Sequence, residues 1–308
     1  MQTAHSVLMV RPAAFKGNPE TRLSNYFQKT LSPAPDVAEL ARAAFDGYVM
    51  ALEDAGVNVR VMHEAAGQDT PDSLFPNNWI AMMEDGTIYT FPMEAQNRRR
   101  ERRQDIVAGL TRDYVVNRRI DLSVFEDKGL YLEGTGSLIL DHDNRIAYAC
   151  RSSRSSEVAA KEFESLSGYR MHWFNARDRH LHPVYHTNVM MSLGKKFAIV
   201  CLESLASGAE RQRLLSSLQR TGKEVIDVTW SQMEAFACNV LELKDRHGQP
   251  VYAMSTRAWA SFTPAQQKKI SDYARLALAP IDIIEDLGGG GARCMVAEIF
   301  LEKKMAYS

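Results

Sequence analysis

Short apolar runs recur along the chain, and longer segments with apolar residues at helical spacing separate them. Runs of four to six residues bounded by polar or turn residues are typical of strands. The alternation of such runs with amphipathic helices predicts an α/β fold. The predicted strands are Ser6–Val10, Asn58–Met62, Trp79–Met83, Thr87–Phe91, Ser137–Leu140, Arg145–Ala149, Val189–Leu193, Phe197–Cys201, Glu224–Val228, Val240–Leu243, Val251–Met254, Ile281–Ile284 and Met295–Phe300. The predicted helices are Asp36–Ala55, Asn97–Thr111, Ser155–Ser165, Leu205–Arg220 and Thr263–Leu278.

The order of these elements bears on domain organisation. No segment rich in Pro, Gly or Ser divides the chain, and no exact repeat is visible in the sequence. We therefore expect a single domain, residues 1–308. The last predicted helix has an explicit start, because Thr263 is a good N-cap, Pro264 suits the first turn and Gln266 can close a capping box.

Composition and charge narrow the class of protein. Hydrophobic residues make up 45% of the chain, charged residues make up 24%, and the net charge is −1. These values are typical of a soluble globular protein and give no overall reason to bind nucleic acid or an anionic membrane. The run Arg98–Arg103 is the local exception. With Glu101 in its middle, we interpret the run as a solvated helix face, with a nucleic-acid-binding helix as the alternative.

Cysteine usage and the first residues of the chain indicate the compartment. The four cysteines are widely spaced and form no C-x-x-C pair, so neither a zinc knuckle nor a disulfide framework is signalled. The residues from Met1 lead directly into an apolar strand without a signal-peptide pattern, and no stretch reaches the length of a membrane helix. We expect a cytoplasmic protein.

The glycine run 288–291 precedes Ala292, Arg293 and Cys294. Consecutive glycines allow a loop to take positive φ angles or to approach another group closely. A thiol beside an arginine has its thiolate form favoured, which makes Cys294 a candidate nucleophile. The alternative is a small buried hydrophobic residue.

Two polar clusters open apolar strands. Glu133 lies between Leu132 and the stretch Gly134–Ser137, and it could pair with a histidine or be an ordinary turn carboxylate. His186 begins the cluster that continues to Asn188, and a histidine there could transfer protons near neutral pH. His180 and His182 lie close by, but their spacing has no tetrahedral zinc signature.

A third polar cluster, Asp72–Asn78, enters the predicted strand that begins at Trp79. Asx residues around a proline are common in turns. Consecutive amides facing a pocket would instead offer donors and acceptors to a neutral polar group.

Taken in order, these motifs resemble the guanidino-group-modifying enzymes, which include arginine deiminase, dimethylarginine dimethylaminohydrolase and the amidinotransferases. The resemblance extends from about Pro71 to Cys294. The segments 75–79 and 132–137 and the late glycine-rich loop with its cysteine are most similar to the citrulline-utilisation hydrolases, or citrulline ureidases. The resemblance implies the pentein fold, a five-bladed α/β propeller with a central active site.

The resemblance also implies a role for each matching residue. Cys294 would be the nucleophile, His186 the general acid and base, and Glu133 the partner that holds the histidine. Arg98 and Arg154 would bind the substrate α-carboxylate, as the arginine fork suits that group. The implied substrate-binding residues are Asp72, Phe75, Asn77, Asn78, Arg98, Arg154 and Asn188.

The departures from the family pattern concern the substrate. Asn77, Asn78 and Asn188 stand where relatives that act on a guanidinium carry acids. A buried carboxylate beside an uncharged ureido group would be an unpaired charge, whereas an amide can hydrogen-bond both the C=O and the NH₂. The amides favour citrulline as the substrate, with ornithine, carbon dioxide and ammonia as products of a covalent thiocarbamate route.

Two alternatives remain open at this point. One is a hydrolase or amidinotransferase that acts on arginine or a substituted arginine with the same three residues. The other is a non-catalytic pentein binding protein, since a fold does not fix a function. In the enzymatic readings we expect a small-molecule substrate, no metal and no organic cofactor, and neither a nucleic-acid nor a membrane partner. A homo-oligomer remains compatible with the sequence.

Overall fold

A computed structural model describes residues 1–29, 36–64 and 67–305. Its strands belong to one six-stranded sheet, in the order β2-β1-β15-β3-β4-β5, and three three-stranded sheets. The strands are β1 (Ser6–Arg11), β2 (Asn58–His63), β3 (Ile80–Met82), β4 (Thr87–Thr90), β5 (Arg118–Asp121), β6 (Ile139–Asp141), β7 (Ile146–Cys150), β8 (Arg170–Phe174), β9 (Met191–Leu193), β10 (Phe197–Val200), β11 (Glu224–Asp227), β12 (Leu241–Lys244), β13 (Pro250–Ser255), β14 (Arg275–Ala279) and β15 (Ala297–Ile299).

Helices of different lengths connect the strands. The α-helices are α1 (Pro19–Arg22), α2 (Val37–Asp54), α3 (Gln104–Asp113), α4 (Gly134–Ser137), α5 (Glu157–Ser167), α6 (Thr187–Met190), α7 (Gly208–Arg220), α8 (Trp230–Glu234), α9 (Thr256–Ser261), α10 (Pro264–Ser271) and α11 (Asp282–Gly288). The 3₁₀ helices are η1 (Pro76–Asn78), η2 (Asn97–Glu101), η3 (Ser123–Lys128) and η4 (Leu202–Ser204).

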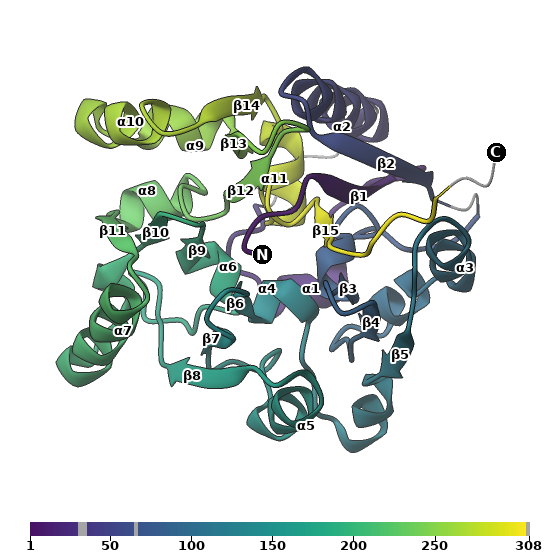
Figure 1. Cartoon of the computed structure of the whole chain (residues 1–308), viewed down its shortest axis with the longest axis horizontal. Helices are drawn as coiled ribbons and strands as arrows, with labels where there is room; N and C mark the ends of the chain where they lie inside the picture. The colour runs from purple at the N-terminus through teal and green to yellow at the C-terminus, as the bar shows by residue number, and fades with distance from the viewer. Residues whose placement is uncertain (30–35, 65–66, 306–308) are drawn as a thin grey trace.

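One strand arrangement recurs through the sheets. A short strand pairs antiparallel with the next strand in the unit, and that strand pairs parallel with a third, as in β6-β7-β8. Among the described residues the arrangement occurs five times, and the unit β15-β1-β2 joins the two ends of the chain. Longer helices lie at the rim and the short first strands lie nearer the centre (Figure 1). This α/β arrangement confirms the predicted fold class.

The rim helices are amphipathic, and α2 illustrates how they pack. Its buried residues Ala41, Phe45, Tyr48 and Leu52 recur at intervals of three and four, which places them on one helix face. This face joins a core cluster with Val7 and residues of β13 and β14. Burial of such a face supplies most of the stability of a surface helix.

The strand predictions hold for most first and second strands of the units and fail for several third strands. β5, β8 and β14 were not predicted, because their exposed or partly exposed residues produce little apolar signal. The predicted strand Ile281–Ile284 is wrong, because this segment belongs to α11, where Ile284 and Leu287 are buried at helical spacing. A short apolar run does not distinguish a strand from a buried helix.

The predicted helices 36–55, 155–165 and 205–220 match α2, α5 and α7 to within three residues at each end, and the other two differ more. The capping box of Thr263 and Gln266 is present, yet α10 ends at Ser271 and the remainder of the predicted helix contains β14. The predicted helix Asn97–Thr111 is divided into η2 and α3, because Arg103 takes an extended conformation between them. The first residues of the predicted strands Val189–Leu193 and Met295–Phe300 form a turn or short helix instead.

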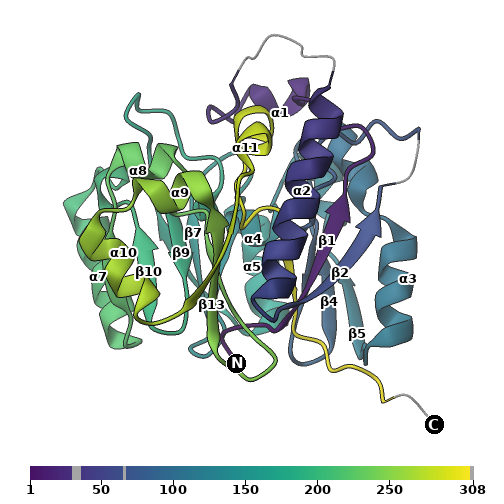
Figure 2. The same ribbon diagram turned by 90° about the horizontal axis from the view of Figure 1, so that it is seen from above.

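Short turns precede the first strand of each unit, and these turns position the site. Asn78 ends η1 before β3, Glu133 precedes α4 and β6, and Asn188 lies in α6 before β9. Asn239 and Cys294 lie in the turns before β12 and β15. In Figure 2, α1 and α11 lie at the upper end of the molecule, away from the first residues of the chain.

Candidate active site

The glycine run places Cys294 beside an aromatic ring. Gly289 ends α11 with a φ of 63°, a conformation that suits glycine. A Cβ at Gly290 would lie 3.1 Å from both the Phe75 ring and the Cys294 Cβ. The loop therefore uses both properties expected from its sequence, a positive φ angle at Gly289 and close approach to Phe75 and the buried Cys294 at Gly290.

Two side-chain amides donate to the sulfur of Cys294. Asn188 Nδ2 lies 3.3 Å from Sγ and Asn239 Nδ2 lies 3.2 Å from it. Burial raises the pKa of the Cys294 thiol, and the two amides oppose this effect. The resting residue is therefore a neutral thiol at neutral pH, with two dipoles in place to stabilise the thiolate once it forms.

Arg293 contributes less to the thiol than the sequence predicts. Its Nη2 lies 2.9 Å from Glu298 and its Nη1 donates to the Val296 carbonyl oxygen. The guanidinium is thus paired with Glu298, while burial and the two amides act on the pKa of Cys294 more strongly than Arg293 does. The charge of Arg293 lowers the pKa of Cys294, as predicted, but burial outweighs it and the pKa of the thiol is raised.

His186 and Glu133 form a buried pair. His186 Nε2 lies 2.8 Å from Glu133 Oε2, so the predicted contact between these residues is present. Burial lowers the pKa of His186 to about 4, although the Glu133 carboxylate acts in the opposite direction. Burial would raise the pKa of Glu133, but Arg154 and His186 outweigh it and hold the pKa below its ordinary value. At neutral pH the pair is a neutral imidazole oriented by a carboxylate.

Glycines in α4 allow the close approach of these groups. A Cβ at Gly136 would lie 2.4 Å from Asn78 Nδ2 and 2.8 Å from His186 Nδ1. Gly134 has a φ of 46°, and a Cβ there would meet the Asn77 carbonyl oxygen at 2.3 Å. The segment Gly134–Gly136 thus lies between η1 and α6, where there is room for its backbone but not for side chains.

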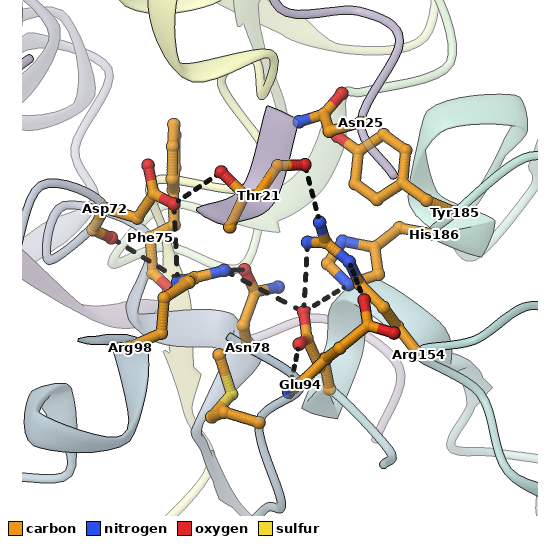
Figure 3. Close-up of polar contacts among 12 residues, drawn as sticks. Thr21, Asn25, Asp72, Phe75, Asn78, Glu94, Arg98, Arg154, Tyr185 and His186 are labelled. Atoms are coloured by element: carbon orange, nitrogen blue, oxygen red, sulfur yellow. Dashed lines mark hydrogen bonds and ion pairs between the residues drawn. The ribbon is translucent and has the colours of Figure 1, made fainter. Parts of the chain in front are cut away.

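The loop before β3 supplies an oriented amide. Arg98 Nη1 donates to Asn78 Oδ1 at 2.8 Å, so Asn78 Nδ2 is directed away from Arg98 and has no protein partner. Asp72 Oδ2 accepts from Asn18 and Thr21, while its other oxygen is buried without a partner. Burial raises the pKa of Asp72, and Arg98 opposes this effect. Figure 3 shows the contacts of Arg98 with Asn78 and of Asp72 with Thr21.

The two predicted carboxylate-binding arginines are both buried and engaged. Arg98 binds Glu101 through Nε and Nη2, and its Nη2 also faces the Asp72 and Phe75 carbonyl oxygens. Arg154 donates to Glu94 and Glu133. That they bind a substrate carboxylate stays a prediction. In the structure, Arg98 orients the side-chain amide of Asn78.

The arginine run is not the solvated face expected from the sequence. Arg98 and Glu101 are buried and paired with each other, and Arg102 pairs with Glu126. Arg103 pairs with Asp105. Three arginines of the run are therefore paired with acids, of which Glu126 is distant in sequence and Glu101 is brought against Arg98 by the turn of η2.

A small cavity brings the predicted residues together with others that sequence reasoning missed. Its lining includes Cys294, His186, Asp72, Phe75, Asn78, Arg98 and Arg154. The missed lining residues include Thr21, Asn25 and Tyr185. Asn77, Asn188 and Glu133 are buried and are not among the lining residues, and the Asn77 carbonyl oxygen accepts from Thr135.

Asn239 was missed although the sequence carries a signal for it. It directly precedes the apolar segment of β12, as Asn188 precedes Val189 and Asn78 precedes Trp79. The N-terminal residues near the site had no such signal, because Thr21 and Asn25 belong to an irregular polar segment around α1.

In the described ranges, no three His, Cys, Asp or Glu side chains come together as ligands for a metal ion. The helices within those ranges also include none with the length and apolar character needed to span a membrane.

The fold was compared with solved structures. One similar structure is the N-terminal domain of ArgZ, a cyanobacterial arginine dihydrolase, solved as a cysteine-to-serine mutant bound to substrate. It superposes with a TM-score of 0.72 at 13% identity, over 96% of this chain and 97% of that domain. AgrE, as a cysteine-to-alanine mutant with L-arginine, gives a TM-score of 0.70 at 14% identity over 96% of this chain and 40% of that one. Full-length ArgZ is also covered over only 39% of its length, so this chain spans about two fifths of each full-length relative.

A dimethylarginine dimethylaminohydrolase, as the S-methyl-L-thiocitrulline adduct of a histidine-to-glycine mutant, gives a TM-score of 0.64 at 14% identity over 97% of this chain and 100% of that chain. No curated protein sequence matches this chain significantly. The structural matches show that this α/β fold is that of the pentein and dimethylarginine dimethylaminohydrolase structures.

The solved structures that share this fold include hydrolases that act on C–N bonds, an arginine dihydrolase and a dimethylarginine dimethylaminohydrolase. The sequence matches one family model over residues 11–301, described as N,N dimethylarginine dimethylhydrolase, eukaryotic. The chain belongs to this family.

Proposed function

We propose that this protein hydrolyses the ureido group of citrulline and releases ornithine, carbon dioxide and ammonia. Cys294 is the nucleophile, His186 transfers protons, and Glu133 orients His186. The orientation of Asn78 is the observation that carries the choice of substrate.

Arg98 fixes which end of the Asn78 amide is left without a partner. Because Asn78 Oδ1 accepts from Arg98 at 2.8 Å, the NH₂ group is the end left without a partner. A guanidinium carries only donors, whereas a ureido group carries a carbonyl oxygen that can accept from this NH₂. A guanidinium would leave a buried donor unpaired, at a cost of about 1–3 kcal/mol.

Asn188 complements the other end of the ureido group. Its Nδ2 donates to the sulfur of Cys294, which leaves its Oδ1 as a buried acceptor without a partner. An acceptor beside the nucleophile suits the ureido NH₂. The two amides together therefore offer one donor and one acceptor, as the ureido group requires, and neither adds a negative charge.

The chemistry begins from a neutral thiol and a neutral imidazole. His186 takes the proton of Cys294 as Sγ attacks the ureido carbon, and it then gives that proton to the ornithine nitrogen as the C–N bond breaks. This leaves a carbamoyl group on Sγ as a thiocarbamate. His186 next takes a proton from a water molecule as its oxygen attacks the thiocarbamate carbon, the C–S bond breaks, and His186 returns the proton to Sγ. The carbamate that is released decomposes to carbon dioxide and ammonia. Glu133 stabilises the imidazolium that forms in each half of the reaction.

Arginine hydrolysis is the second candidate, and Asp72 favours it. The free Oδ1 of Asp72 is a buried acceptor in the cavity lining, which suits a cationic donor. ArgZ and AgrE, which share the fold, are an arginine dihydrolase and a protein solved with L-arginine. Substrate measurements separate the two candidates.

The test compares kcat/KM for citrulline and for arginine in the wild type and in Asn78→Asp. We expect the wild type to prefer citrulline. In Asn78→Asp the donor is lost, so kcat/KM for citrulline should fall by about tenfold or more, and the ratio of citrulline to arginine activity should fall with it. The exposed Asn58→Asp on β2 is the matched control and should leave the ratio unchanged. A wild type that prefers arginine, or an unchanged ratio in Asn78→Asp, would contradict the proposal.

The wider predictions from the sequence are part of the same proposal. We propose that residues 1–308 form one catalytic domain, that its five strand units are the blades of a propeller around this site, and that the enzyme works in the cytoplasm on a small-molecule substrate without metal or organic cofactor.

A further inference from the structure

Asn239 contacts Cys294 at two points. Its Nδ2 lies 3.2 Å from Sγ, and its Oδ1 accepts from the Cys294 backbone N–H at 3.3 Å. The backbone carbonyl oxygen of Asn239 also accepts from the Arg293 N–H at 3.2 Å. One residue thus holds both the sulfur and the backbone of the turn that carries it.

The orientation of the Asn239 amide is determined by the backbone. Nδ2 also donates to the Asn188 carbonyl oxygen at 3.0 Å, and Oδ1 faces the Cys294 N–H, so a flipped amide would place donor against donor and acceptor against acceptor. Asn239 is 1% exposed, and water does not compete for these contacts. The N–H directed at Sγ is therefore fixed before any substrate arrives.

Gly291 provides the space for this contact. A Cβ at Gly291 would lie 3.0 Å from Asn239 Oδ1 and 3.2 Å from the Phe236 ring. The glycine run before Cys294 therefore allows both Asn239 and Phe75 to pack closely against its backbone.

We propose that Asn239 is a catalytic residue that stabilises the Cys294 thiolate through a preorganised amide donor. This proposal deepens the proposed function and rests on the nucleophilic role of Cys294. It does not depend on the identity of the substrate. In many reactive cysteines a neighbouring cation stabilises the thiolate. Here the Arg293 guanidinium is paired with Glu298, and the Asn239 amide stabilises the thiolate instead. When Cys294 loses its proton to His186, the negative charge appears next to the N–H groups of Asn239 and Asn188 and costs no reorganisation.

The test measures thiol ionisation without substrate. The rate of Cys294 alkylation by iodoacetamide is followed against pH, with peptide mapping to confirm the modified residue. In Asn239→Asp a carboxylate replaces the donor at nearly the same volume, so the pKa of Cys294 should rise by one unit or more. Alkylation below that pKa should then slow about tenfold.

A second variant tests the contact without removing Asn239. Gly291→Ala should displace the amide by a few tenths of an ångström and raise the pKa of the thiol by a smaller amount. Asn58→Asp is the control and should leave the alkylation profile unchanged. If both site variants lose thermal stability while the pH profile of alkylation stays at its wild-type position, Asn239 has only a structural role and the proposal is overturned. An enzyme inactive on citrulline with a shifted profile would refute the proposed substrate and leave this inference standing.

Discussion

A primary amide has a donor end and an acceptor end, so when a protein group binds one end, the other end is the one available to a ligand. In Asn78 the partner is Arg98, and in Asn188 it is the sulfur of Cys294. The sequence identified both residues as amides in place of acids. It could not identify which end of the Asn78 amide is left without a partner, because Arg98 lies 20 positions from Asn78 and was expected on a solvated helix face.

At low pH, we expect the protonation of His186 to determine the rate of the reaction. Burial lowers the pKa of His186 to about 4, so at neutral pH the imidazole can accept the proton of Cys294. Protonation at lower pH removes this base. We therefore expect kcat/KM to fall as the pH drops through about 4 rather than through 6.5, the ordinary value of histidine.

The measurement is a pH profile of kcat/KM, with unfolding monitored at each pH. Glu133→Gln removes the charge that raises the pKa of His186, so the acid limb should move lower while the rate falls, because the imidazolium loses its partner. His172→Gln is the control, since His172 lies on β8 outside the cavity lining, and it should keep the wild-type limb. An acid limb near pH 6.5 would show that His186 is not buried as described or is not the base.

At the scale of elements, short turns before the first strands carry the chemistry. The sequence indicated these turns by polar residues directly before apolar runs, as at Glu133 and His186. The same rule extends to Asn239. Third strands such as β5 gave little signal, since they are polar and exposed and owe their conformation to pairing with the second strand.

The turn formed by α4 offers a direct test of this reading. Gly136→Ala places a Cβ against Asn78 Nδ2 and His186 Nδ1, so it should displace both groups. We expect kcat/KM to fall by about a hundredfold, the loss typical of misplacing a catalytic group by about 1 Å. The measurement is steady-state kinetics together with thermal unfolding.

Two other glycines supply the controls. Gly208 has no neighbour within 4 Å of an added Cβ, so Gly208→Ala should leave kcat/KM unchanged. Gly47 is equally open inside α2, and Gly47→Ala should raise the free energy of unfolding by about 0.5–1 kcal/mol without affecting turnover. Full activity in Gly136→Ala would contradict the positions given to Asn78 and His186.

At the scale of the whole molecule, the chain folds back on itself. β15, near the C-terminal end, pairs with β1 and β3. This pairing places the turn that holds Cys294 beside the loop Asp72–Asn78. The N-terminal segment reaches the same place, where Asn25 donates to the Gly288 and Gly289 carbonyl oxygens. The α/β class and the contact between Glu133 and His186 were predictable, since alternating elements and the family resemblance indicate both.

The contacts of Asn25 and Asn239 were not predicted, because they depend on which turns meet after folding. The six-stranded sheet formed by two units was equally outside the reach of local patterns. Residues from the two ends and the middle of the chain thus form one site.

The central claim is a covalent carbamoyl group on Cys294, and mass spectrometry tests it directly. The protein is mixed with citrulline, quenched in acid within a turnover and digested. We predict that the peptide containing Cys294 gains one carbamoyl group, and that Cys294→Ser gains none while keeping its fold. An amidino group from arginine with no adduct from citrulline would contradict the account of the substrate, and ornithine formation by Cys294→Ser at the wild-type rate would contradict the account of the nucleophile.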